Sequence, residues 1–435
     1  MKKALNVILV AFQPQAVKTF FDQIDYSKIH LLEVFSDRPN QVHLVVDGNH
    51  KDILPLHSIL PYIEQYREED VYWILGSAYF ESGNLEAIAK LLRARGIPSD
   101  HVLNGFIGGF YNDVTHYQWN LRYAEREPLD YIATGISYIE KGLDITQLPY
   151  RGGNLAASSQ DLYYSYRTAV DIFAHGNPLK FCLIGVCPYI LSYEMRQSFA
   201  TIGASRQYEL LLPGEAREED IFFGLLSDSF KKGYVERSAP ADLGNVAFRR
   251  ASSHDITLDT FFNVERALKD VIVKLRQKSF QNNLQILQSY IRLCQEHGAK
   301  PIAVMLPFSP VIHDRYPQRE LADFRAVLQS LHDTMGLEII DLFDLRLDYD
   351  CFCDLTHMNM RGAAVASRAL NEQLERVLHY PPPKIILKSY IYIKRPCKDR
   401  ALHGLALWFQ KYRAFRSASF FFAAFSSSAF ICFVM

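Results

Sequence analysis

The first part of the chain alternates short apolar runs with segments of helical periodicity. The apolar runs are NVILVAF (6–12), HLLEVF (30–35), VHLVV (42–46), VYWILGS (71–77) and HVLNGF (101–106). These runs are short and rich in β-branched residues, as in strands buried on both faces. Between them, LEAIAKLLRARG (85–96) has helical spacing, late basic residues and a closing glycine. This βαβ order predicts a parallel sheet, and we expect residues 1–125 to form a Rossmann-like α/β domain.

A second unit with the same alternation is expected over residues 126–380. Its strand-like runs are DYIATG (130–135), FCLIGVC (181–187), KPIAVMLP (300–307) and LEIIDLF (337–343). Apolar residues with helical spacing predict a long helix over about 258–296 and an amphipathic helix after Arg361. The fold class is therefore α/β in both units, with mostly parallel sheets.

Composition and charge exclude several classes of protein. The chain has 435 residues, 49% of them hydrophobic, and a net charge of -1. An apolar share of this size rules out a disordered or collagen-like chain. A balanced charge provides no overall steering toward nucleic acid, so we expect no nucleic-acid partner.

The last segment, residues 381–435, differs from the rest. It opens on Pro381–Pro383, carries nine Lys or Arg and a single Asp from Lys384 onward, and closes on the apolar stretch 418–435. Eighteen residues is the lower limit for a membrane-spanning helix, and the basic flank suits a cytoplasmic side. Cys432 also fits a C-a-a-X prenylation sequence. A membrane anchor, a prenylated tail and an unstructured extension all remain open.

Cysteine usage and the N-terminus bear on the compartment. The seven cysteines are scattered and odd in number, which is unlike a secreted disulfide framework. The apolar run after Lys3 is short and Pro14 ends it, so we interpret it as a buried strand and not as a signal peptide. These features predict a cytoplasmic protein, with membrane contact only through the tail.

Two short motifs carry residues suited to catalysis. Ser137 follows the strand DYIAT through Gly135, at the carboxyl end of a strand and the start of a helix, where ligands gather in open α/β sheets. Asp354 and His357 form a D-x-x-H in the loop before the last helix. A carboxylate can orient a histidine that serves as base to a serine. Taken singly, the two motifs are better explained by an N-cap serine and by surface polar residues.

The order and placement of these motifs resemble the SGNH/GDSL-type hydrolase superfamily over residues 126–380. The resemblance implies an α/β/α domain of three layers. In the superfamily's second conserved block, the oxyanion-hole glycine falls on Ser159, whose backbone N–H could donate. In the third block, Cys187 stands where the family has asparagine, and Asn154 is a candidate substitute donor.

The pattern is similar to a divergent branch that includes the alginate O-acetyltransferases and the D-alanyl-lipoteichoic acid biosynthesis protein. The resemblance implies a serine-dependent acyl hydrolase or O-acyltransferase that acts on an acylated glycan or cell-surface polymer precursor. It implies Ser137 as nucleophile, His357 as base and Asp354 as the residue that orients it. The N–H groups of Ser137 and Ser159 would bind the oxyanion, and no metal or cofactor is required.

Two other functions remain open. Loss of the asparagine at Cys187 fits a catalytically inactive SGNH-like protein that binds carbohydrate or assists assembly. The N-terminal domain could bind a nucleotide, although it has no G-x-G-x-x-G sequence.

Overall fold

The computed structural model describes most of the chain up to residue 379. The described residues are 4–41, 44–46, 49–77, 82–105, 113–199, 201–212, 220–236, 264–265, 268 and 279–379. Every described residue belongs to one compact unit, Met1–Ile386. The predicted tail and most of the first half of the helix predicted over 258–296 lie outside the described residues.

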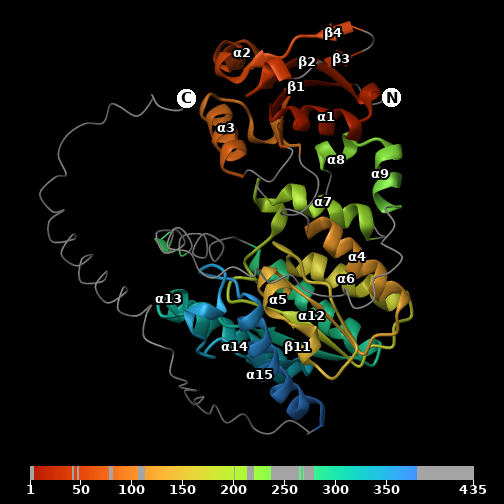
Figure 1. Cartoon of the computed structure of the whole chain (residues 1–435), viewed down its shortest axis with the longest axis vertical. Helices are drawn as coiled ribbons and strands as arrows, with labels where there is room; N and C mark the ends of the chain where they lie inside the picture. Colours follow the sequence, from red (N-terminus) through yellow and green to blue (C-terminus); the bar gives the residue numbers. More distant parts are fainter. Residues whose placement is uncertain are drawn as a thin grey trace, which may run out of the picture. The chain divides into compact units, whose positions relative to one another are not determined.

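The N-terminal residues form a five-stranded parallel sheet (Figure 1). Its order is β5-β2-β1-β6-β7, with β1 at Leu5–Phe12, β2 at Ile29–Ser36, β5 at Leu54–Pro55, β6 at Val71–Ser77 and β7 at Val102–Asn104. The helices between them are α1 (Pro14–Gln23), α2 (Ile59–Tyr66) and α3 (Ser82–Ala94). The first apolar run therefore forms a strand that is buried from Val7 to Phe12, as predicted, and this strand is the central one of the sheet.

One predicted strand of this region is placed differently. Residues 42–46 were expected in the parallel sheet, but β3 (Leu44–Val46) pairs antiparallel with β4 (Asn49–Lys51) in a separate ribbon. The sequence between them contains Asp47-Gly48, a strong signal for a tight hairpin. Val45 is 55% exposed, so this strand is not buried on both faces.

Alternate residues of β1 serve two different cores. Val7 and Leu9 pack on the face covered by α1, whereas Ile8 and Val10 pack on the face covered by α2 and α3. Phe222 of α8 (Ile221–Leu225) joins the α1 face, although it lies far along the chain. Both faces are buried, which explains why the strand sequence is continuously apolar.

The second sheet is also five-stranded and parallel. Its order is β12-β11-β10-β8-β9, with β8 at Tyr131–Thr134, β9 at Gly152–Asn154, β10 at Phe181–Gly185, β11 at Lys300–Met305 and β12 at Glu338–Asp341. Strand β9 was not predicted, because two of its three residues are glycines. A Cβ on Gly152 would lie 2.0 Å from the Tyr131 ring, so the glycine makes room for that side chain.

Helices cover both faces of this sheet. The core of one face includes side chains from α4 (Asp113–Arg126), α6 (Leu162–Ala174), α12 (Phe280–Glu296) and α14 (Gln318–Met335). The core of the other face includes side chains from α5 (Ser137–Gly142) and α15 (Met360–His379). The remaining described helices are α7 (Ile202–Leu211), α9 (Asp228–Val235) and α13 (Pro310–His313). Among the described helices, none combines the length and the apolar character that crossing a membrane requires.

Contacts cross the predicted domain division at residues 125 and 126. Helix α4 ends at that division, and its Tyr117 and Leu121 belong to the core of the second sheet. In the other direction, α8 completes the core of the first sheet. The division itself stays a prediction.

A buried ion pair joins α7 to the start of α8 and to the first sheet. Arg206 is 2% exposed, and its guanidinium donates to Asp220 at 2.7 and 3.1 Å and to the Asn104 carbonyl at 2.6 Å. Burial alone would raise the pKa of the Asp220 carboxyl, but the charge and hydrogen bonds of Arg206 hold that pKa below its usual value. This pair therefore stabilises the fold only while Asp220 is ionised.

We expect Arg206→Met to lower the free energy of unfolding by about 3–5 kcal/mol, because it leaves the Asp220 charge buried without its partner. Urea denaturation at pH 7 measures this loss. The difference from wild type should shrink as the pH falls below about 4, because the stabilisation by a carboxylate of depressed pKa is lost with falling pH. The control is Lys18→Met, because Lys18 pairs with Asp22 on the exposed surface. A loss as small as that of the control would contradict the role of the buried pair.

Candidate active site

The end of β8 lies against the end of β10, and two glycines allow this approach. Gly135 has φ +135°, and a Cβ there would lie 2.9 Å from Gly185 Cα. A Cβ on Gly185 would in turn lie 2.1 Å from Ile139 Cγ1 and 2.7 Å from the Thr134 carbonyl. The chain can therefore turn sharply out of β8 into α5, as the sequence predicted for Gly135.

Ser137 is the first residue of α5 and points its hydroxyl at His357. It is 9% exposed, and its Oγ lies 2.7 Å from His357 Nε2. The two residues are 220 positions apart in the sequence. The first backbone N–H groups of a helix have no acceptor within the helix, so the N-terminus of α5 can donate to an anion beside Ser137.

Asp354 holds the other side of the imidazole. Its Oδ2 lies 2.7 Å from His357 Nδ1, and its Oδ1 accepts from the backbone N–H groups of Thr356 and His357 at 2.7 and 2.8 Å. Burial would raise the pKa of this carboxyl, but His357 and the two N–H groups hold the pKa far below its ordinary value. Asp354 is thus ionised at neutral pH and fixes the ring so that Nε2 faces Ser137.

The loop that carries Asp354 and His357 is held at several points. Asn359 donates to the Asp350 carbonyl at 2.7 Å and accepts from the N–H of Gly362, at the start of α15. Ser309, before α13, donates to the Leu355 carbonyl. These bonds limit the movement of the histidine relative to the sheet.

A tight turn brings Ser159 to the same edge of the sheet. The Gln160 N–H donates to the Ala157 carbonyl at 3.0 Å, and Ser159 has φ +65°. A positive φ at the third position of a turn favours glycine. This is the position at which the SGNH resemblance places a glycine. The Gln160 side chain accepts from the Gly135 N–H at 2.8 Å and so ties this turn to the serine turn.

Asn154 does not act as the substitute oxyanion donor that the sequence proposed. Its Nδ2 lies 3.1 Å from the carbonyl of Ile139 and 3.4 Å from those of Glu140 and Leu143, and its Oδ1 accepts from the Ala156 N–H. The residue is 2% exposed. Its amide is therefore used to satisfy carbonyls of α5, because the end of a helix leaves such groups without partners.

Sequence reasoning missed a buried carboxylate beside the site. Glu140 lies one helical turn after Ser137 and is 6% exposed. It accepts from Ser158 Oγ at 2.7 Å. Ser158 precedes Ser159, so Glu140 links the serine helix to the second turn. The i, i+3 spacing from Ser137 was the available signal, but a single Glu on a short helix is too common to interpret.

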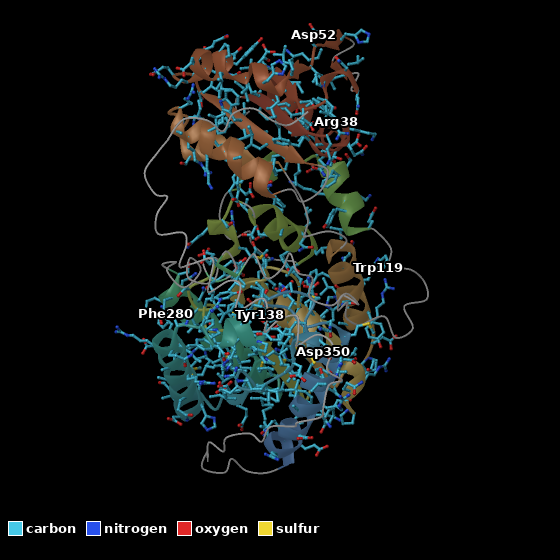
Figure 2. The ribbon with its side chains drawn as sticks, turned by 60° about the vertical axis from the view of Figure 1, so that its left-hand side comes forward. Arg38, Asp52, Trp119, Tyr138, Phe280 and Asp350 are labelled. Carbon is cyan, nitrogen blue, oxygen red and sulfur yellow. The ribbon has the colours of Figure 1, made fainter. Side chains whose placement is uncertain are left out.

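Aromatic side chains lie around the imidazole. The ring of Tyr138 (labelled in Figure 2) lies 5.5 Å from that of His357 and 4.7 Å from that of Phe308, centroid to centroid. Tyr189 donates from its hydroxyl to that of Tyr138 at 3.1 Å. Cys187 is 2% exposed. The aromatic rings make one side of the site apolar.

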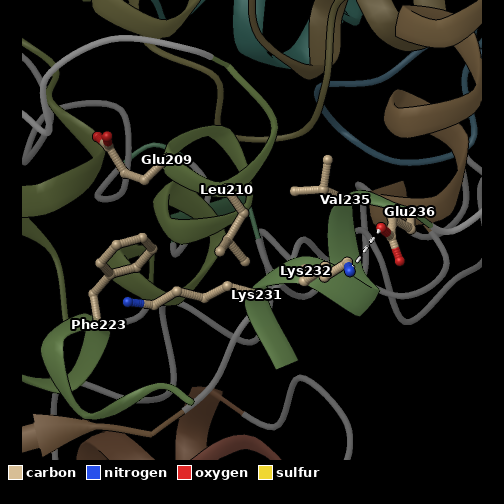
Figure 3. A pocket seen from close by; sticks show the side chains of 7 residues that line it. All are labelled: Glu209, Leu210, Phe223, Lys231, Lys232, Val235 and Glu236. Atoms are coloured by element: carbon tan, nitrogen blue, oxygen red, sulfur yellow. Dashed lines mark ion pairs between the residues drawn. The ribbon is translucent and has the colours of Figure 1, made fainter. Parts of the chain in front are cut away.

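A hollow of about 370 Å³ lies away from these residues, where α7, α8 and α9 meet (Figure 3). Its lining includes Glu209, Phe223 and Lys231, and Lys231 Nζ lies 5.0 Å from the centre of the Phe223 ring. Lys232 pairs with Glu236 at its rim. It contains none of the predicted catalytic residues, so it is not the candidate active site.

We expect Gly185→Ala to lower the free energy of unfolding by about 1–3 kcal/mol, because the new methyl group overpacks against Ile139 and the Thr134 carbonyl. It should also move α5 and with it Ser137. Thermal denaturation measures the effect. Gly233→Ala is the matched control, because a Cβ on Gly233 in α9 would have no atom within 4 Å. We expect this variant to be as stable as wild type or more stable. Equal stability of the two variants would contradict the close approach.

We expect Ser159→Gly to preserve the fold and any activity of the site, because the backbone N–H remains. Relief of a left-handed conformation, which costs about 1–2 kcal/mol for a residue with a Cβ, offsets the greater flexibility of glycine in the unfolded chain. Ser159→Val should be less stable than wild type, since a β-branched residue is strained at this φ. Urea denaturation compares the three proteins. A stable valine variant would show that the turn is not constrained.

The sequence matches no protein-family model and no curated protein.

Proposed function

We propose that the protein is a serine-dependent acyl hydrolase or O-acyltransferase. One observation carries the proposal: Ser137 Oγ, His357 and Asp354 form a continuous chain of hydrogen bonds, with both contacts to the imidazole at 2.7 Å. A serine, a histidine and a carboxylate in this order are the parts needed to activate a hydroxyl as a nucleophile.

In the proposed mechanism, Ser137 Oγ attacks the carbonyl carbon of an ester as His357 Nε2 takes its proton. The tetrahedral intermediate collapses when the imidazolium gives that proton to the leaving alcohol, which leaves an acyl group on Ser137. Water or a second alcohol then attacks the acyl-enzyme, with His357 again as base, and restores the free serine. Whether the acceptor is water or a sugar hydroxyl decides between hydrolysis and transfer.

The charges that develop in this reaction have partners in the site. Asp354 is ionised and faces the ring nitrogen opposite Ser137, so it stabilises the imidazolium form of His357. The N–H groups of Ser137 at the start of α5 and of Ser159 in its turn are the proposed oxyanion donors. One such donor is worth roughly 10²–10³ in rate.

The topology of the second sheet supports an SGNH-like domain. Numbered from β8, its strand order is 2-1-3-4-5. The strand that follows β8 in the sequence is added on one side of it and all later strands are added on the other side, so the strand order reverses between β8 and β10. Ligand sites in open α/β sheets lie outside the carboxyl ends of the strands at such a reversal, and Ser137 follows β8 there. The first sheet, numbered from β1, has the order 3-2-1-4-5 of Rossmann-like domains.

For the substrate we propose an acylated glycan or cell-surface polymer precursor. The resemblance to polymer-modifying acyltransferases is the basis of this choice. The partly exposed Tyr138 beside His357 adds a flat apolar surface of the kind on which sugar rings pack.

The test is intact-mass spectrometry of the protein after treatment with a fluorophosphonate, which phosphonylates activated serines. We expect one adduct on wild type, none on Ser137→Ala, and a rate reduced by about 10³-fold or more in His357→Ala, because removal of a triad member costs rates of that order. His313→Ala is the matched control. His313 also lies beside an aspartate, with Nε2 3.0 Å from Asp344 Oδ1, and should leave the adduct unchanged.

Absence of an adduct on correctly folded wild type would contradict the proposal. The protein would then be better explained as an inactive SGNH-like protein. Cys187 is the observation that favours this alternative, because a buried thiol is a weak hydrogen-bond donor where the family has an amide. Retained binding of a glycan without acyl-enzyme formation would support it.

A further inference from the structure

Two carboxylates and a histidine meet between α4 and α6, on elements that the proposed reaction does not use. Glu125 lies on α4, whereas Asp171 lies on α6 and His175 caps its end. One ligand atom from each of the three residues lies within 4.8 Å of the other two. Asp171 and His175 are four positions apart and therefore lie on the same face of their helix.

Asp171 carries a buried carboxylate oxygen that the described residues leave without a partner. It is 3% exposed, and its Oδ2 is buried with no hydrogen-bond partner among the described residues. Burial, reinforced by the negative charge of Glu125, raises the pKa of this carboxyl to about 6. A buried, unpartnered carboxylate oxygen next to a second carboxylate is costly unless a cation lies between them or one of them is protonated.

The charges nearby neutralise only part of this pair. Within the described part of the chain, no Lys or Arg side chain donates a hydrogen bond to Asp171. Arg122 donates to both oxygens of Glu125, at 2.6 and 2.8 Å. Hydrogen bonds of this kind to an outer partner are usual for carboxylates that bind metals. His175 is 43% exposed in its side chain, with Nδ1 2.8 Å from the Asp171 carbonyl and 3.8 Å from Asp171 Oδ1.

We propose that Glu125, Asp171 and His175 form a binding site for a divalent transition metal, with zinc as the metal that fits best. Imidazole together with carboxylates suits zinc, whereas magnesium and calcium prefer oxygen ligands alone. Tetrahedral zinc with bonds to nitrogen and oxygen of about 2.0–2.2 Å holds its ligand atoms about 3.3–3.6 Å apart. Ligand atoms that lie within 4.8 Å of one another therefore approach by up to about 1.5 Å on binding. The exposed ring of His175 can supply that movement, and water completes the coordination.

An ion at this position would fasten α4 to α6. Both helices pack on the second sheet, and Tyr117 of α4 is already hydrogen-bonded to Thr168 of α6 at 2.7 Å. The site is therefore structural in kind, and it is independent of whether Ser137 is a nucleophile.

The experiment is a titration of the metal-free full-length protein with Zn²⁺, followed by isothermal calorimetry and thermal denaturation. We expect saturable binding and a rise in melting temperature. Asp171→Asn and His175→Ala should each weaken binding by more than the roughly 10- to 100-fold that loss of an outer partner costs. With Co²⁺ in place of Zn²⁺, visible absorption bands should appear on wild type and be lost in both variants.

Asp171→Asn keeps the shape of the side chain and removes a buried charge, so the metal-free variant should be no less stable than wild type. His297→Ala is the matched control, because His297 stacks on Phe173 near the end of α6 without joining the cluster. Binding that survives in Asp171→Asn and His175→Ala, or that is lost in His297→Ala, would overturn the proposal. Absence of Zn²⁺ binding to wild type would also overturn it, and the two carboxylates would then share a proton.

Discussion

The close approach of Gly135 to Gly185 is the constraint on which the candidate site depends. No side chain fits between the ends of β8 and β10, since a Cβ at either position would meet backbone or Ile139 at 2.1–3.0 Å. Because the backbones touch, the chain leaves β8 with φ +135° at Gly135 and enters α5 at once. Ser137 therefore projects from the start of a short helix whose base is fixed by packing. A serine held in this way loses little conformational freedom when a substrate binds, so the free-energy cost of orienting it is small.

Buried polar side chains link the segments around the site. The Gly135 N–H cannot join a regular ladder at the turn, and the buried side chain of Gln160 accepts its hydrogen bond. Glu140 binds Ser158, and Asn154 binds the carbonyls of α5. Buried polar groups need hydrogen-bond partners. Gln160 supplies one at the sharp turn, and Asn154 supplies one at the end of α5. They hold the serine turn and the turn at Ser159 together, so the polar residues of the segment 154–160 have a structural role.

Much of the fold could be predicted because it follows from local pattern. Runs such as 6–12 and 181–187 are continuously apolar, and both became buried parallel strands because helices cover both faces of their sheets. The hydrophobic pattern did not predict the correct strands at two places. Strand β9 begins with two glycines, and residues 44–46 are apolar but turn back into a ribbon. Apolar content alone does not distinguish a central strand from an exposed hairpin; the neighbouring Asp-Gly does.

Some residues of the candidate site could likewise be predicted from local sequence, whereas others could not. Ser137, Asp354 and His357 could be singled out because strand ends and the loop before the last helix are fixed by topology, and a D-x-x-H spacing is local. Asn154 could not be assigned correctly, because its role depends on the carbonyls of Ile139 and Leu143 that face it in the folded chain. Glu125 is 46 and 50 positions from Asp171 and His175, and only the packing of α4 on α6 brings them together. Candidate residues can be found in a sequence when they lie at the end of one strand or within one loop. A cluster that forms only where two helices pack together cannot be found before the fold is known.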